Sequence, residues 1–155
     1  YFQIIHDKTA SLISASCKIG GLLGEADEET VESLGFFGQS IGTAFQIRDD
    51  LIDILSDECS VGKPTGKDVA KGKMTLPSII LLSDDPRCSD KLQMALGCGD
   101  LVALRALMDG SSAFSSTQET ISGLVDNAID SIGAFGHCAA GNYLVGLARQ
   151  ISEPV

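Results

Sequence analysis

The sequence contains no tryptophan, and aromatic residues make up only 5% of it. A core of this composition must be built from leucine, isoleucine, valine and alanine, which suits packed helices. Basic residues are also scarce: 11 lysines and arginines stand against 21 aspartates and glutamates, which gives a formal net charge of −10. Such a chain repels nucleic acid and anionic lipid unless its cations gather in one place. We therefore expect no nucleic-acid partner, and the positions of the lysines matter more than their number.

Long apolar runs and paired cysteines are missing as well. The longest apolar candidate, 76–82, contains a proline and a serine and falls far short of the ~20 residues of a membrane span. The protein is therefore expected not to span a membrane. The five cysteines are irregularly spaced and form no CxxC pair, which argues against a zinc site and favours reduced thiols in a cytoplasmic protein.

Apolar residues recur with a helical period through most of the chain, and no strand pattern of any length occurs. We therefore expect an all-α fold that forms a single region over residues 1–155. Residues 57–72 should form a loop, because glycine, proline and charged residues gather there. The expected helices cover 4–23, 28–55, 75–82, 89–96, 100–108, 116–135 and 139–151. The helix over 28–55 contains several glycines, each costing about 1 kcal/mol relative to alanine, which predicts close packing or a nearby ligand.

The end of that helix carries an aspartate motif, Asp49-Asp50-Leu51-Ile52-Asp53. Asp49 and Asp53 share one face of a helix, because they are four residues apart. Their mutual repulsion is relieved if a divalent cation lies between them, and oxygen ligands without histidine or cysteine favour a hard ion such as Mg²⁺. Considered alone, the motif is explained about equally well by a solvated acidic helix face.

A cluster of lysines follows the aspartates and consists of Lys63, Lys67, Lys71 and Lys73. Neighbouring glycines allow the backbone to approach a ligand closely, and lysines provide point charges for phosphate. Considered alone, a solvated loop is an equal explanation. Beside the aspartates, the cluster predicts a site for a metal–diphosphate complex. It is not a Walker A loop, because the GxxxxGK[ST] order is absent and no strand precedes it.

A third feature is the pair Lys8-Thr9 in the first expected helix, which by itself is more often an ordinary surface pair. The three features occur in a fixed order: Lys8-Thr9-Ala10, then GTAFQIRDDLID over 42–53, GKPTGKD over 62–68 and GKMTLP over 72–77. This combination resembles the C-terminal half of the trans-prenyltransferases, the all-helical polyprenyl diphosphate synthases, over about residues 5 to 80.

The resemblance implies the C-terminal helices of the isoprenoid synthase fold without its N-terminal half. It implies a transferase that condenses an allylic prenyl diphosphate with isopentenyl diphosphate, with Mg²⁺ as its cofactor, and a homodimer for the complete enzyme. By the match, Thr9 and Gln46 lie beside the allylic carbon. The implied metal ligands are Asp49, Asp50 and Asp53, and the implied ligands of the leaving diphosphate are Lys8, Lys63 and Lys73. The expected catalytic residues are Lys8, Thr9, Gln46, Asp49, Lys63 and Lys73.

The sequence also departs from the family pattern. The first aspartate-rich motif and the basic residues that hold isopentenyl diphosphate are missing, and Asp84-Asp85-Pro86 does not replace them. The chain begins without methionine, and we expect it to be a fragment that is inactive alone and exposes apolar surface. The alternative is a non-catalytic, diphosphate-binding or regulatory subunit of a heteromeric synthase. A terpene cyclase is disfavoured by the lysine cluster.

Overall fold

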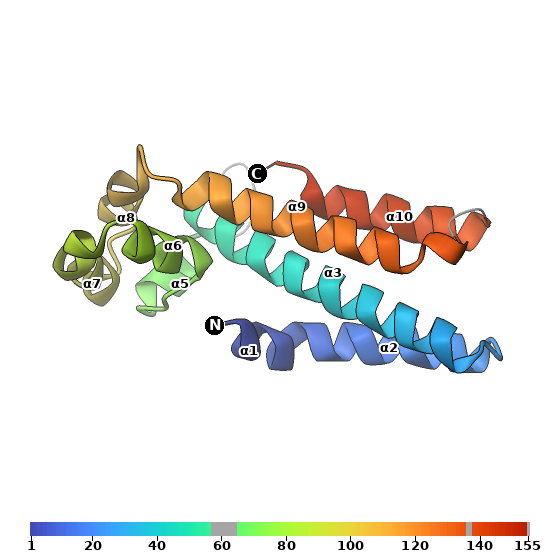
Figure 1. Cartoon of the computed structure of the whole chain (residues 1–155). Helices are drawn as coiled ribbons and strands as arrows, with labels where there is room; N and C mark the ends of the chain where they lie inside the picture. The colour runs from blue at the N-terminus through green and yellow to red at the C-terminus, as the bar shows by residue number, and fades with distance from the viewer. Residues whose placement is uncertain (57–64, 136–137, 155) are drawn as a thin grey trace. The chain divides into compact units, whose positions relative to one another are not determined.

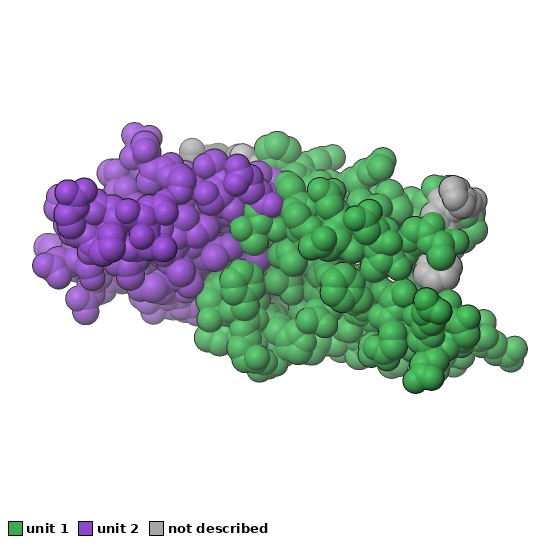
Figure 2. All heavy atoms as spheres, in the orientation of Figure 1, with its two compact units in different colours: residues 1–46, 120–154 green, residues 47–119, 155 purple. Residues whose placement is uncertain are grey.

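The computed structural model describes residues 1–56, 65–135 and 138–154, and these residues contain helices and no strand (Figure 1). The expectation of an all-α fold is confirmed. The contacts gather in two compact units, one formed by residues 1–46 and 120–154 and the other by residues 47–119 (Figure 2). The single region expected over 1–155 stays a prediction. Within the described residues, every helix is too short or too polar to cross a membrane.

The first unit contains the N-terminal and C-terminal helices of the chain. The expected helix over 4–23 is present but is interrupted, because a π-helical turn separates its first residues from the rest. The elements of this unit are α1 (Phe2–Ile5), the π-helix η1 (His6–Ala10), α2 (Ser11–Leu23), most of α3 (Glu28–Leu55), the second part of α9 (Ala113–Ser131), η3 (Gly133–Phe135) and α10 (Ala139–Ser152).

Glycines of α3 let the helix approach η1 and α2 closely. A Cβ atom built on Gly42 would lie 2.6 Å from the Cα of Ala10, and one built on Gly38 would lie 2.8 Å from the backbone of Ser14. Ser14 also donates a hydrogen bond of 2.8 Å to the carbonyl of Gly35. Close packing is therefore the reason for these glycines.

The second unit surrounds its own apolar core, to which most of its helices contribute. Its further elements are α5 (Lys67–Ala70), α6 (Leu76–Asp84), the 3₁₀-helix η2 (Pro86–Cys88), α7 (Ser89–Cys98) and α8 (Leu101–Met108). The core contains Ile54, Val69, Leu81, Cys88, Leu92, Ala95, Leu96, Leu104, Met108 and Ala113. The expectation of a loop over 57–72 was wrong for 67–70, where a short helix forms because Val69 is anchored in this core. Residues 57–64 lie outside the described residues.

Candidate functional site

The first group of candidate residues stands on η1. Within this π-helical turn, the N–H of Ser11 donates to the carbonyl of His6, five residues earlier. Single π turns inside α-helices occur frequently at functional sites. Lys8 and Thr9 lie in the middle of the turn, where Lys8 is exposed and Thr9 is half-buried.

Thr9 contacts the second predicted residue of this group. Its Oγ1 donates a hydrogen bond of 2.9 Å to Oε1 of Gln46, a side chain that is only 4% exposed. The absence of a side chain at Gly42 permits this contact, because it lets the backbone of Ala10 lie against α3. The structure therefore brings together the two residues that were expected beside the allylic carbon.

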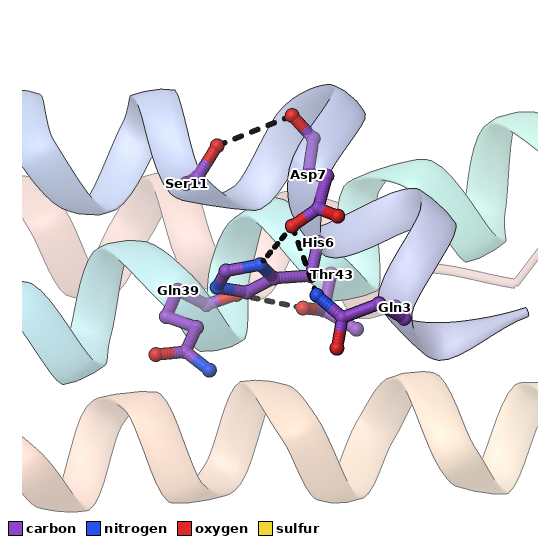
Figure 3. Close-up of polar contacts among 6 residues, drawn as sticks. All are labelled: Gln3, His6, Asp7, Ser11, Gln39 and Thr43. Carbon is purple, nitrogen blue, oxygen red and sulfur yellow. Dashed lines mark hydrogen bonds and ion pairs between the residues drawn. The ribbon is translucent and has the colours of Figure 1, made fainter.

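Polar contacts around Asp7 tie α1 to η1 (Figure 3). Oδ1 of Asp7 accepts a hydrogen bond of 2.9 Å from Nε2 of Gln3 and lies 3.0 Å from Nδ1 of His6. The hydrogen bonds with His6 and Gln3 hold the pKa of the Asp7 carboxyl below its usual value. The hydroxyl of Ser11 donates to the Asp7 carbonyl at 3.3 Å. These contacts stabilise the turn that carries Lys8 and Thr9.

The second group stands on the last turns of α3, where the three aspartates lie. Asp50 is 5% exposed, whereas Asp49 and Asp53 are half-buried. Leu51 and Ile54 alternate with them and are almost completely buried. The apolar side chains of this stretch thus anchor the helix in the core and hold the acidic side chains in place.

Asp53 holds the segment that begins α5. Its Oδ1 and Oδ2 accept hydrogen bonds from the backbone N–H groups of Lys67 and Asp68, at 3.1 Å and 2.9 Å. Its carbonyl accepts a further bond of 2.9 Å from the N–H of Gly66, which has a φ of +73°. Asp53 therefore caps the N-terminus of α5, where unpaired N–H groups favour a negative charge.

Lys73 lies near these aspartates. Its Nζ donates a hydrogen bond of 2.6 Å to Oδ1 of Asp68. That bond raises the pKa of Lys73 above its usual value, and the charges of Asp68, Asp50 and Asp53 add to the increase. One of the lysines expected to bind diphosphate is thus within electrostatic reach of two of the expected metal ligands. Lys67 and Lys71 are exposed, and Lys63 lies outside the described residues.

The donor atoms at the end of α3 suit a magnesium ion that also binds phosphate. In the parts of the chain that the structure describes, no three His, Cys, Asp or Glu side chains gather so as to hold a metal ion. Mg²⁺, however, is usually bound by one or two carboxylates together with water and substrate phosphates. Asp53 keeps lone pairs for such an ion after accepting two N–H groups, because a carboxylate offers about four acceptor positions. The aspartates therefore fit a shared metal–phosphate site.

The sequence analysis missed two residues that make contacts in and around the candidate site. Asp68 was visible within the GKPTGKD stretch, but nothing there indicated that it pairs with Lys73. Arg105 is an isolated charged residue within the apolar sequence of α8. Its guanidinium donates to the carbonyls of Ile54, at 2.6 Å, and Ser56, at 3.0 Å. A cation at these unpaired carbonyls stabilises a helix C-terminus. No local pattern could reveal this contact, because about 50 residues separate the partners.

Comparisons with known proteins identify the family of the chain. The family model described as polyprenyl synthetase matches residues 1–103. A short chain isoprenyl diphosphate synthase of Methanothermobacter thermautotrophicus is 44% identical over 104 residues, which are 64% of this chain and 31% of that protein. Component 2 of the heptaprenyl diphosphate synthase of Geobacillus stearothermophilus is 45% identical over 85 residues, 55% of this chain and 27% of that protein.

A solved structure reproduces the fold. The polyprenyl synthase of Caulobacter crescentus, complexed with calcium and isoprenyl diphosphate, matches with a TM-score of 0.87 and 28% identity over 98% of this chain and 48% of that chain. The fold is therefore that of the helical isoprenoid synthases. The chain belongs to the polyprenyl synthetase family. It spans about half of this solved structure and a third or less of the two relatives, and the roles of its site residues stay predictions.

Proposed function

We propose that this chain is the diphosphate-binding part of a prenyl diphosphate synthase, which joins an allylic prenyl diphosphate to isopentenyl diphosphate. The observation that carries the proposal is that an ammonium group and carboxylates lie near one another in the second unit. The ammonium of Lys73, whose side chain is 51% exposed, lies within the electrostatic reach of Asp50 and Asp53. Carboxylates that accept a metal ion, beside an accessible ammonium, form the kind of site that a metal-bound diphosphate requires.

The reaction begins with cleavage of the allylic C–O bond, and both electrons leave with the diphosphate oxygen. The carbocation is then attacked by the double bond of isopentenyl diphosphate, which forms the new C–C bond, and a proton is lost to the released diphosphate. Mg²⁺, when bound, neutralises the charge that develops on the leaving group. The lysines that the resemblance assigns to the leaving group are Lys8, Lys63 and Lys73, and each would contribute a charge-assisted hydrogen bond that strengthens as the C–O bond breaks.

In this proposal, Thr9 and Gln46 stabilise the carbocation. A carbocation requires a pocket without water, in which weak dipoles face the cation and no nucleophile captures it. The hydroxyl of Thr9 and the amide oxygen of Gln46 are such dipoles, and their mutual hydrogen bond of 2.9 Å fixes the direction of both. Gln46 is 4% exposed, which supports a role inside a pocket that excludes water.

The complete enzyme requires helices beyond those of this chain. The outer face of α1 and α2 exposes large apolar side chains, in agreement with the expected apolar surface. These are Ile4, Leu12, Ile19, Leu22 and Leu23, with exposed fractions of 56% to 81%. Gly21 of α2 and Ala10, the last residue of η1, are buried on the opposite face, so η1 and α2 carry apolar residues on both sides, as helices covered by neighbours would. We propose that further helices cover this face and that the 155 residues alone do not form prenyl diphosphates.

The lysines provide the test of the proposal. In the complete synthase, Lys63→Ala and Lys73→Ala should each lower kcat about a hundredfold, because loss of one such contact costs ~3 kcal/mol in the transition state. Lys67→Ala and Lys71→Ala are matched controls from the same segment, and screened surface charges contribute about 1 kcal/mol or less. Equal losses in all four variants, with folding intact, would show that the segment is a diffuse basic patch.

A second candidate is the subunit of a heteromeric synthase, which the similarity to a heptaprenyl synthase component 2 favours. The two candidates differ in what must be added to obtain activity. A homodimeric synthase elongates prenyl diphosphates with one type of polypeptide, whereas a heteromeric one requires a second gene product. An aspartate-rich DDxxD motif encoded upstream of Lys8 would favour an enzyme with its own first metal motif. Chain elongation by the purified 155 residues would contradict our proposal for the isolated chain.

A further inference from the structure

The side chain of Asp68 is more sheltered than that of its partner Lys73. The two side chains are 21% and 51% exposed, respectively. Lys73 is attached to Asp68 twice: its backbone N–H donates to the Asp68 carbonyl at 2.9 Å, and its Nζ donates to the Asp68 carboxylate at 2.6 Å. Gly72, with a φ of +66°, makes the turn that brings Lys73 back over α5. The ammonium is therefore held at one end while its other side stays accessible.

Asp68 is in turn fixed relative to the aspartate motif. Its backbone N–H is bound by Oδ2 of Asp53, and the neighbouring N–H of Lys67 is bound by Oδ1. Val69, which follows, is 2% exposed and belongs to the core of the second unit. A continuous series of contacts thus leads from Asp53, through Asp68, to the ammonium of Lys73.

We propose that Asp68 is a positioning residue, which holds the ammonium of Lys73 beside the aspartates of α3 so that it can bind the oxygens of a metal-bound diphosphate. This inference rests on the proposed function. A lysine side chain has four flexible carbons, and ordering it in advance lowers the entropy lost on binding. An ammonium has three N–H donors, so the bond to Asp68 leaves two for phosphate oxygens. Asp53 contributes by anchoring Asp68.

Two variants of Asp68 separate positioning from general stability. Asp68→Asn keeps the shape but removes the charge, and Asp68→Glu keeps the charge on a longer side chain. The pKa of Lys73, followed by NMR of labelled lysines, should fall towards the usual lysine value in D68N and stay raised in D68E. Glu32→Gln is the matched control, because Glu32 pairs with Lys18 at 2.7 Å in the first unit. It should leave the pKa of Lys73 unchanged.

The second measurement is the affinity of the chain for inorganic diphosphate in the presence of MgCl₂, by titration calorimetry. We expect D68N to weaken binding about tenfold, a change typical of losing one well-placed charged contact, and D68E to restore part of it. Once Lys73 is replaced by alanine, D68N should add no further loss, because a residue that acts through Lys73 has nothing left to position.

The outcomes distinguish the inference from the proposed function. If K73A weakens diphosphate binding and D68N does not, the positioning role of Asp68 is refuted. If D68N weakens binding as much with alanine at position 73 as with lysine, Asp68 acts independently, and the inference also fails. If neither K73A nor D68N affects binding, or if the unsubstituted chain binds no diphosphate, the proposed function fails. If, in addition, D68N leaves the pKa of Lys73 unchanged, the contact between Asp68 and Lys73 on which the inference rests is also refuted.

Discussion

Gly42→Ala should destabilise the first unit, although alanine is the better helix former. The added Cβ would lie 2.6 Å from the Cα of Ala10 and 3.1 Å from its Cβ, whereas ordinary contacts begin at 3.4 Å. The obstacle includes backbone, which cannot rotate away, so η1 and α3 must separate. Overpacking of this kind costs about 1–3 kcal/mol, and the helix propensity of alanine returns about 1 kcal/mol. We expect a net loss of up to about 2 kcal/mol.

Gly123→Ala in α9 is the matched control for this substitution. A Cβ built on Gly123 meets no atom within 4 Å, so only the propensity effect should remain, a gain of about 1 kcal/mol. Urea unfolding followed by circular dichroism measures both variants, and the two midpoints should move in opposite directions. NMR should also show that G42A perturbs the amide of Thr9, whereas G123A does not. If G42A proved as stable as the unsubstituted chain, the argument that the glycine is required for close approach would be wrong.

Two further substitutions test contacts that hold the candidate site. Arg105→Ala should destabilise the chain by about 2 kcal/mol in urea unfolding, because hydrogen bonds to charged groups contribute ~1.5–3 kcal/mol. Arg105→Lys should recover only part, since an ammonium lacks the fork that reaches the carbonyls of Ile54 and Ser56. Thr9→Val removes the donor to Gln46 and should cost about 1–3 kcal/mol, while Thr9→Ser should cost much less. Equal effects of valine and serine at position 9 would exclude the hydrogen bond as the cause.

The helices and the family could be predicted from the sequence, because both depend on local order along the chain. The helical period of the apolar residues predicted a helix over 28–55, and α3 spans these same residues. Proline predicted the boundaries around α6, where Pro77 lies in the first turn and Pro86 follows the end. The order of the lysine–threonine pair, the aspartates and the lysine cluster identified the family, which the comparisons confirm.

The contacts that organise the candidate site were decided only by the tertiary structure. A π turn at Lys8 and Thr9 differs from an α turn by a single added residue, and the apolar period of 4–23 does not resolve so small a change. Lys73 pairs with Asp68, and the backbone N–H of Asp68 is in turn bound by the carboxylate of Asp53, which holds α5 at the end of α3. Arg105 reaches α3 only because α8 packs in the same core. Periodicity and composition report which face of a helix is buried, whereas the partner of a charged side chain depends on where distant segments meet.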